Sequence, residues 1–226
     1  MSLLARTSFT LAAALALAAP AAAVTFLDGS FEGGAFGGRI THDGGVREVQ
    51  AMGGDAPGGW LEYGAGVGYV ESSVWQASAG NRSLDLGALG TGGIVQRISG
   101  FVPGRTYRLS FDVSANPFDP AARPLDKRVL VSASGMAPSL FTYQLTEANT
   151  PDNMRYQRFT YEFEAVSETQ NIRFASLSPG SFGAVLDDVS LSAVPEATTW
   201  ALLITGFGSV GVIARRRRAR RPMVTA

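Results

Sequence analysis

The stretch Tyr107-Arg108-Leu109-Ser110-Phe111-Asp112-Val113 alternates strictly between apolar and polar side chains. Phe159-Thr160-Tyr161-Glu162-Phe163-Glu164 repeats the same alternation. Successive side chains of an extended strand point to opposite faces, so a period of two predicts strands with one face in a core and the other in water. Half-buried strands of this kind are typical of antiparallel sheets, and these two stretches therefore decide the fold class as all-β.

Other segments of the chain extend the same pattern. Turn sequences such as Val102-Pro103-Gly104 and Ser178-Pro179-Gly180 separate them, and residues 24–194 contain no convincing helical stripe. The spacing predicts a single β-sandwich or barrel over residues 24–194. The further predicted strands are 94–98, 127–133, 140–145, 170–177 and 184–191.

The composition excludes several classes of function. The chain has 226 residues, no cysteine and one histidine, so a disulfide scaffold, a thiolate metal site and a multi-histidine metal centre are excluded. Its 19 basic and 19 acidic residues balance overall, but residues 24–194 hold 12 basic and 18 acidic residues, a formal charge of −6. An acidic domain argues against a nucleic-acid partner, because neutralising phosphates needs a basic surface.

The first 23 residues read as a secretory signal peptide. Arg6 precedes an apolar run over residues 9–19, and small residues follow at Ala21, Ala22 and Ala23. This order of segments predicts cleavage by signal peptidase between Ala23 and Val24. We therefore expect residues 24–194 to be exported.

The other end of the chain predicts a short transmembrane helix. Residues 200–214 (WALLITGFGSVGVIA) carry no charge, and Arg215, Arg216, Arg217 and Arg218 follow them directly. As a helix these fifteen residues would span about 22 Å, against a hydrocarbon core of about 30 Å, and residues 197–199 nearly close the gap. The positive-inside rule then places the arginines in the cytoplasm and the helix in the inner membrane.

Residues 195–221 also resemble a known sorting signal. Pro195 and Glu196 precede Trp200, the apolar segment and the arginine cluster, and this three-part order resembles the PEP-CTERM signal of Gram-negative bacteria. Ala197 stands where that family's motif has its second proline. The resemblance implies recognition by an exosortase, a membrane protease that cuts near the motif, in bacteria that make exopolysaccharide. A permanent membrane anchor is the alternative.

A second resemblance covers nearly all of residues 24–194. Asp28-Gly29-Ser30-Phe31-Glu32, the stretch from Trp75 to Leu86 (WQASAGNRSLDL) and Leu186-Asp187-Asp188-Val189 resemble the choice-of-anchor C family of exported bacterial domains. The resemblance implies a galactose-binding-like jelly roll, an extracellular location and a glycan partner. It implies no reaction.

Trp75 and its neighbours are candidate glycan-binding residues. An aromatic ring can face the apolar side of a sugar while planar polar groups bind the hydroxyls, and Gln76, Asn81 and Arg82 follow Trp75 closely. In the alternative interpretation Trp75, like Trp60, is a core residue between the sheets.

Four carboxylates are candidate ligands of a structural calcium ion. Asp28 and Glu32 lie near the start of the domain and Asp187 and Asp188 in its last predicted strand, and the first and last strands of a jelly roll can be neighbours. Adjacent strand residues face opposite sides, so we expect one aspartate of the pair to point inward or along the sheet, where a buried carboxylate needs a cation or several donors. The alternative is a hydrogen-bonded carboxylate that ties the last strand to a turn.

No catalytic constellation stands out. The chain has no G-x-S-x-G motif, and Glu162 and Glu164 share a strand face that alternates with buried aromatic residues and so points to solvent. The sequence predicts a non-catalytic, exosortase-sorted protein of the cell surface or extracellular matrix that associates with polysaccharide. A carbohydrate-active enzyme on a jelly roll, or a structural surface protein without a ligand, are the alternatives.

Overall fold

A computed structural model describes residues 24, 27–33, 39–43, 46–50, 59–87, 90–121, 123, 125–195, 205 and 215. The predicted signal peptide, residues 1–23, lies outside the described residues, as does nearly all of the predicted sorting signal after Pro195. Over the described part of the chain, no helix has both the length and the apolar character needed to cross a membrane.

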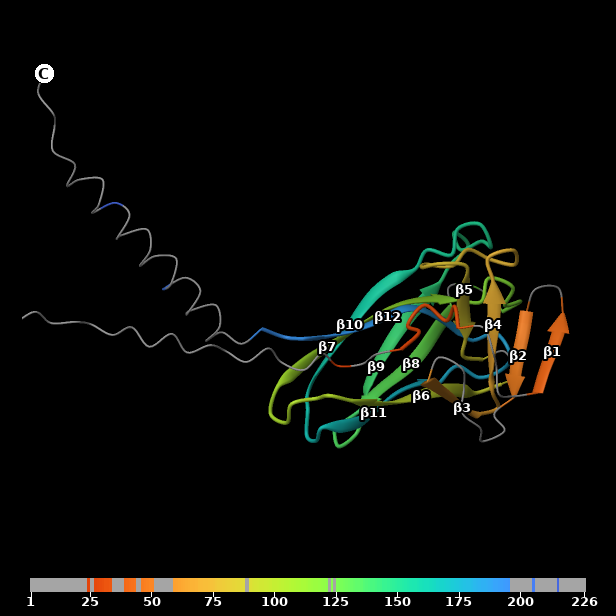
Figure 1. Ribbon diagram of the computed structural model, residues 1–226. Helices are drawn as coiled ribbons and strands as arrows, with labels where there is room; N and C mark the ends of the chain where they lie inside the picture. Colours follow the sequence, from red (N-terminus) through yellow and green to blue (C-terminus); the bar gives the residue numbers. More distant parts are fainter. Residues whose placement is uncertain are drawn as a thin grey trace, which may run out of the picture.

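The described residues form two antiparallel sheets that pack face to face (Figure 1). This arrangement confirms the predicted jelly-roll sandwich. The seven-stranded sheet has the order β1 (Arg39–Asp43), β2 (Val46–Gln50), β4 (Val67–Glu71), β5 (Arg82–Asp85), β12 (Ala184–Ala193), β7 (Thr106–Ala115) and β10 (Gln157–Glu164). The five-stranded sheet has the order β3 (Trp60–Gly64), β6 (Gly92–Ser99), β11 (Thr169–Ser176), β8 (Leu125–Ala133) and β9 (Ser139–Leu145).

The two stretches that decided the fold class pair with each other. β7 and β10 are antiparallel neighbours, with Phe111 opposite Phe159 and Leu109 opposite Tyr161. Leu109 and Phe111 are fully buried, while Arg108 and Glu162 lie on the outer face and form an ion pair at 2.7 Å. The alternation therefore divides core from solvent as the sequence predicts.

Aromatic rings connect the two sheets through the core. Phe111 lies 5.1 Å from Phe174 and Trp60 lies 6.0 Å from the same ring, both in edge-on contacts. Phe31, from the segment before β1, packs on Trp60 at 6.0 Å. Trp60 is fully buried, and its indole N–H donates to the carbonyl of Asp28 at 3.0 Å. Trp60 is therefore a core residue between the sheets, as the alternative interpretation predicts.

A β-bulge in β12 changes the expected orientation of Asp187 and Asp188. The pairing with β7 shifts between Asp187 and Ser190, and Asp188 has a φ of 44°. The bulge adds one residue, so that both aspartates and Ser190 reach the outer side of the seven-stranded sheet. There the guanidinium of Arg158 donates hydrogen bonds to Asp188 and Ser190. The expectation that the two aspartates face opposite sides of the sheet is wrong at this bulge.

Candidate functional site

A groove of about 440 Å³ lies on the outer face of the five-stranded sheet. The outward residues of β8 and β11 form its floor, the turn after β8 forms one wall, and Tyr63 reaches it from β3. No sheet among the described residues covers this face, so that part of the structure leaves the groove open to a ligand. Its lining is Tyr63, Leu130, Ser132, Ala133, Ser134, Met136, Pro138, Asn171, Arg173 and Ala175.

Tyr63 lies across the sheet because Gly93 leaves room for its ring. Gly93 is the cross-strand partner of Tyr63, and a Cβ at Gly93 would meet the Cζ and hydroxyl oxygen of Tyr63 at 2.5 Å. The ring crosses β6, and its hydroxyl donates to the carbonyl of Phe174 on β11 at 2.9 Å. Burial raises the pKa of the Tyr63 hydroxyl, which keeps it protonated as a donor.

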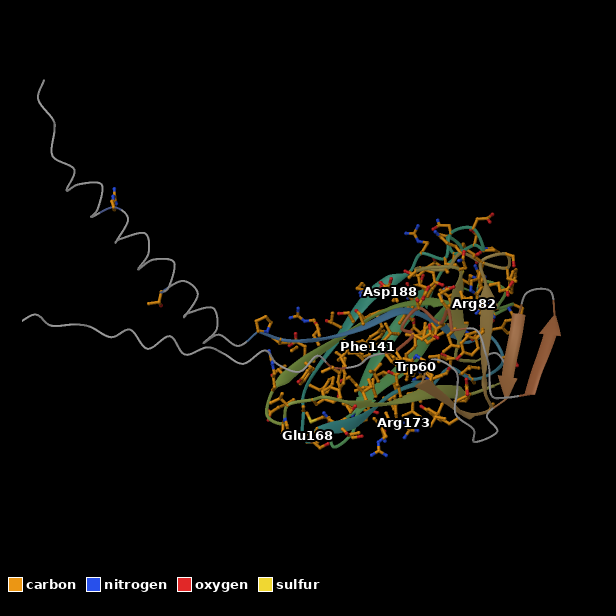
Figure 2. The ribbon with its side chains drawn as sticks, viewed as in Figure 1. Trp60, Arg82, Phe141, Glu168, Arg173 and Asp188 are labelled. Atoms are coloured by element: carbon orange, nitrogen blue, oxygen red, sulfur yellow. The ribbon has the colours of Figure 1, made fainter. Side chains whose placement is uncertain are left out.

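Arg173 covers the ring of Tyr63. Its guanidinium carbon lies 4.5 Å from the ring centroid, within the range of a cation–π contact. Figure 2 shows Arg173 on the outer side of the five-stranded sheet, pointing away from the sandwich. The stack holds the guanidinium in place while its N–H groups stay accessible to a ligand.

Small polar groups lie beside this stack. Ser132 is the cross-strand partner of Arg173, and Asn171 and Ser134 bridge β11 to the turn after β8. The hydroxyl oxygen of Ser134 accepts the backbone N–H of Asn171 at 2.9 Å. The groove thus combines a stacked planar cation, an amide, hydroxyls and the apolar side chains of Leu130 and Met136, a mixture suited to sugar rings and their hydroxyls.

Trp75 lies at a different place from this groove. It is 3% exposed, its indole N–H donates to the hydroxyl of Ser83 at 2.8 Å, and Phe118 packs 6.2 Å from its ring. With Val70, Met154 and Val185 it forms a small apolar cluster. The ring therefore does not offer an open face to a sugar, and its position agrees with the alternative interpretation of a packed tryptophan.

The other predicted glycan-binding residues lie in two places. Gln76 forms a hydrogen bond within the domain, whereas Asn81 and Arg82 line a small groove. The side-chain oxygen of Gln76 accepts the backbone N–H of Met154 at 3.3 Å. Asn81 and Arg82 line a polar groove of about 300 Å³ together with Glu32 and Glu71, and Trp75 does not line it. The predicted set thus lies along one segment, but the structure does not gather it into one binding surface.

The predicted metal ligands near the start of the domain accept backbone N–H groups. One oxygen of Glu32 accepts the N–H of Asn81 at 2.7 Å and that of Arg82 at 2.8 Å. Asp28 accepts the N–H of Gly33 at 3.0 Å, and burial raises the pKa of Asp28. Both carboxylates therefore already have donors.

Asp187 and Asp188 also have partners. Asp187 is fully buried and accepts the N–H groups of Ser78 at 2.7 Å and Ala79 at 2.9 Å. Burial raises the pKa of Asp187 to about 7 against the opposing effect of these donors. Asp188 forms an ion pair with Arg158 at 2.5 Å.

The last strand does lie beside the first segment, since Val189 donates to the carbonyl of Gly29 at 2.9 Å. Within the part of the chain that the structure describes, however, no three histidine, cysteine, aspartate or glutamate side chains are grouped to hold a metal ion. The geometry agrees with the alternative of hydrogen-bonded carboxylates that tie the last strand to a turn. Structural calcium stays a prediction.

A second buried polar cluster was not anticipated from the sequence. Asp85 is 1% exposed and accepts the N–H groups of Gly87 at 2.8 Å and Gly183 at 3.1 Å, and the amide of Asn116 at 2.8 Å. Burial raises its pKa to about 6. A Cβ at Gly183 would lie 2.4 Å from the Asp85 carboxylate, so the tie requires glycine there.

The sequence also missed Tyr63 and Arg173. The usable signals were Gly92-Gly93, since glycine inside a strand marks close approach of other atoms, and the outward position of Arg173 in the alternating segment 170–177. Neither signal brings the two residues together without the pairing of β3, β6 and β11.

The chain is similar to several solved structures and to one protein family. The chain resembles TmCBM61 solved in complex with beta-1,4-galactotriose at 14% identity and a TM-score of 0.42, covering 74% of this chain and 96% of that one. It resembles the CBM22-1 xylan-binding domain from Paenibacillus barcinonensis Xyn10C at 16% identity and a TM-score of 0.40, covering 73% and 100%. It resembles the EclA C-terminal domain, a sugar-binding protein, at 16% identity and a TM-score of 0.33, covering 43% of this chain and 64% of that one.

The sequence matches no curated protein. The family match is more extensive, because it covers residues 25–192, which include every strand of the sandwich except the last residue of β12, Ala193. The chain belongs to DUF642, a family described as proteins of unknown function.

Proposed function

We propose that this chain is a non-catalytic, polysaccharide-binding protein of the cell surface or extracellular matrix, and that the groove beside Tyr63 and Arg173 is its binding site. The observation that carries the proposal is the stack of Arg173 on Tyr63 at 4.5 Å, on a sheet face that no described strand covers. A positioned guanidinium with Asn171 and Ser132 nearby supplies the directional donors and acceptors that sugar hydroxyls need.

A binding role fits this groove better than catalysis. Glycoside hydrolysis needs two carboxylates about 5 to 10 Å apart, and the described lining of the groove contains no aspartate or glutamate. Carboxylates do line two smaller depressions, but Asp119 there pairs with Lys127 at 2.5 Å and Glu32 accepts two backbone N–H groups. These contacts favour structural roles for Asp119 and Glu32.

Export and sorting form a second part of the proposal. The signal-peptide pattern of residues 1–23 and the PEP-CTERM resemblance of residues 195–221 support signal peptidase and exosortase as processing partners, with an inner-membrane intermediate. Mass measurement of the chain from the producing cells tests this part. Loss of residues 1–23 and of the arginine cluster is expected, and an unprocessed chain would contradict it.

Binding of the full chain in detergent to a broad panel of immobilised polysaccharides tests the binding role. We expect at least one polysaccharide to bind, and Tyr63→Ala to weaken that binding about tenfold. Val102→Ala is the control, since Val102 is an apolar side chain 42% exposed outside the groove. Absence of binding across the panel would favour a structural protein without a ligand, and release of reducing ends would indicate an enzyme.

A further inference from the structure

Three arginines share the outer face of the five-stranded sheet. Arg97 comes from β6, Arg128 from β8 and Arg173 from β11, and all three are exposed. Each alternates with buried neighbours in its strand, so its side chain points away from the core. The three strands are consecutive in the sheet, which makes the arginines parts of one surface.

These arginines have no ion pair with any residue that the structure describes, whereas basic side chains elsewhere do. Arg108 pairs with Glu162 at 2.7 Å, and Arg158 pairs with Asp112 at 3.1 Å on the opposite sheet. Three guanidinium groups on one face are thus available to an external anion.

The charge of this face is opposite to that of the domain. Residues 24–194 carry a formal charge of −6, yet the outward residues of the five strands of this sheet include three arginines and a single carboxylate, Asp126. A cationic face on an acidic domain attracts an anionic ligand to that face and repels it from the others.

The strand register places the three arginines along the groove and past its end. Asn171 is opposite Arg97, and Arg173 is two residues further along β11, a diagonal separation of about 7 to 8 Å. Leu177 donates to the carbonyl of Arg128, and Leu177 is four residues from Arg173, about 13 Å along the strand. The positive groups are therefore spaced along an extended line, which fits a polymer with repeated charges better than a single small anion.

We infer that the ligand of this face is a polysaccharide whose sugars carry carboxylate groups, an inference that rests on the proposed function. The planar guanidinium matches a carboxylate through two parallel N–H bonds, and its stacking on Tyr63 leaves it ready to form them. The polar groups of Ser132 and Asn171 then bind the hydroxyls of the same chain.

Isothermal titration of the full chain in detergent tests this inference with polygalacturonate and its fully methyl-esterified counterpart, two polymers that differ in charge. We expect polygalacturonate to bind about tenfold more tightly, and salt to weaken that preference. Arg173→Gln and Arg97→Gln are each expected to lower affinity for polygalacturonate about fivefold or more. Arg108→Gln, on the opposite sheet and paired with Glu162, is the matched control and is expected to leave affinity unchanged.

The outcomes separate the inference from the proposed function. Equal affinity for both polymers, or for a neutral polysaccharide alone, would overturn the inference and leave the proposed function in place. Equally tight binding of dextran sulfate or single-stranded DNA would also overturn it, because the face would then select charge and not a carboxylated glycan. Failure to bind these polymers and every other polysaccharide tested would overturn both.

Discussion

The carboxylate of Asp187 accepts the backbone N–H of Ser78 at 2.7 Å, joining residues 109 positions apart in the chain. The adjacent N–H of Ala79 donates to the same oxygen at 2.9 Å. The segment that follows Trp75 is thereby fixed on the outer side of the seven-stranded sheet. Its conspicuous sequence thus corresponds, in the structure, to a tie between the loop that joins β4 to β5 and the last strand, β12.

Asp187→Asn is expected to lower the free energy of unfolding by about 1 to 3 kcal/mol. The amide oxygen can still accept the N–H groups of Ser78 and Ala79, but the NH2 group then faces the backbone N–H of Asp188, which donates to the other carboxylate oxygen at 2.7 Å. Asp188→Asn is the control, because Asp188 is half-exposed and asparagine accepts a positive φ. Asp188→Asn should lower the free energy of unfolding by less than about 1 kcal/mol. Denaturant unfolding measures both, and equal losses would contradict the proposed tie.

Stability is expected to fall as the pH rises from about 4 to about 7. Burial raises the pKa of Asp187 to about 7 and that of Asp85 to about 6, whereas in the unfolded chain both titrate near 3.9. Between these values the folded protein holds protons that the unfolded chain releases, so raising the pH favours unfolding. Thermal melts across this range measure the effect. A melting temperature that rises from pH 5 to pH 7 would contradict it.

Trp75→Phe is expected to reduce stability and leave glycan binding unchanged. The substitution removes the donor to Ser83, a hydroxyl that is fully buried, at a cost of about 1 to 3 kcal/mol. Trp75 does not line the groove, so affinity for a bound polysaccharide should change by less than about twofold. A loss of affinity at unchanged stability would contradict this prediction and place Trp75 in the binding site.

Gly80→Ala is expected to be more destabilising than a positive φ alone explains. Gly80 has a φ of 67°, and a Cβ there would lie 2.5 Å from the Glu32 carboxylate that accepts the N–H groups of Asn81 and Arg82. Gly104→Ala is the matched control, with a φ of 82° and no atom within 4 Å. The control should lose about 1 kcal/mol and Gly80→Ala clearly more. Equal losses in denaturant unfolding would show that Glu32 moves away freely.

Much of the fold could be predicted because alternation is a local signal. The segments around Leu109, Phe111 and Tyr161 reveal their buried face within seven residues, and the structure confirms the strands predicted there. The bulge between Asp187 and Ser190 could not be predicted, because the shift appears only in the register with β7. One extra residue was enough to place both aspartates on the same side of the sheet.

The candidate site was harder to predict because its parts meet only through strand order. Tyr63 and Arg173 are 110 residues apart, and their stacking depends on Gly93 between them. Trp75 was the more visible candidate, but its exposure depends on Phe118 and on the segment tied by Asp187, which no local pattern shows.

The most direct test of the account is the affinity of the full chain for its best-bound polysaccharide, compared between the unchanged protein and Tyr63→Ala, with folding checked by thermal melting. Tyr63 supports the guanidinium of Arg173 in the groove, so we predict a loss of affinity of about tenfold in a folded variant. Affinity retained within about twofold by folded Tyr63→Ala would contradict the central claim that this groove binds the polysaccharide.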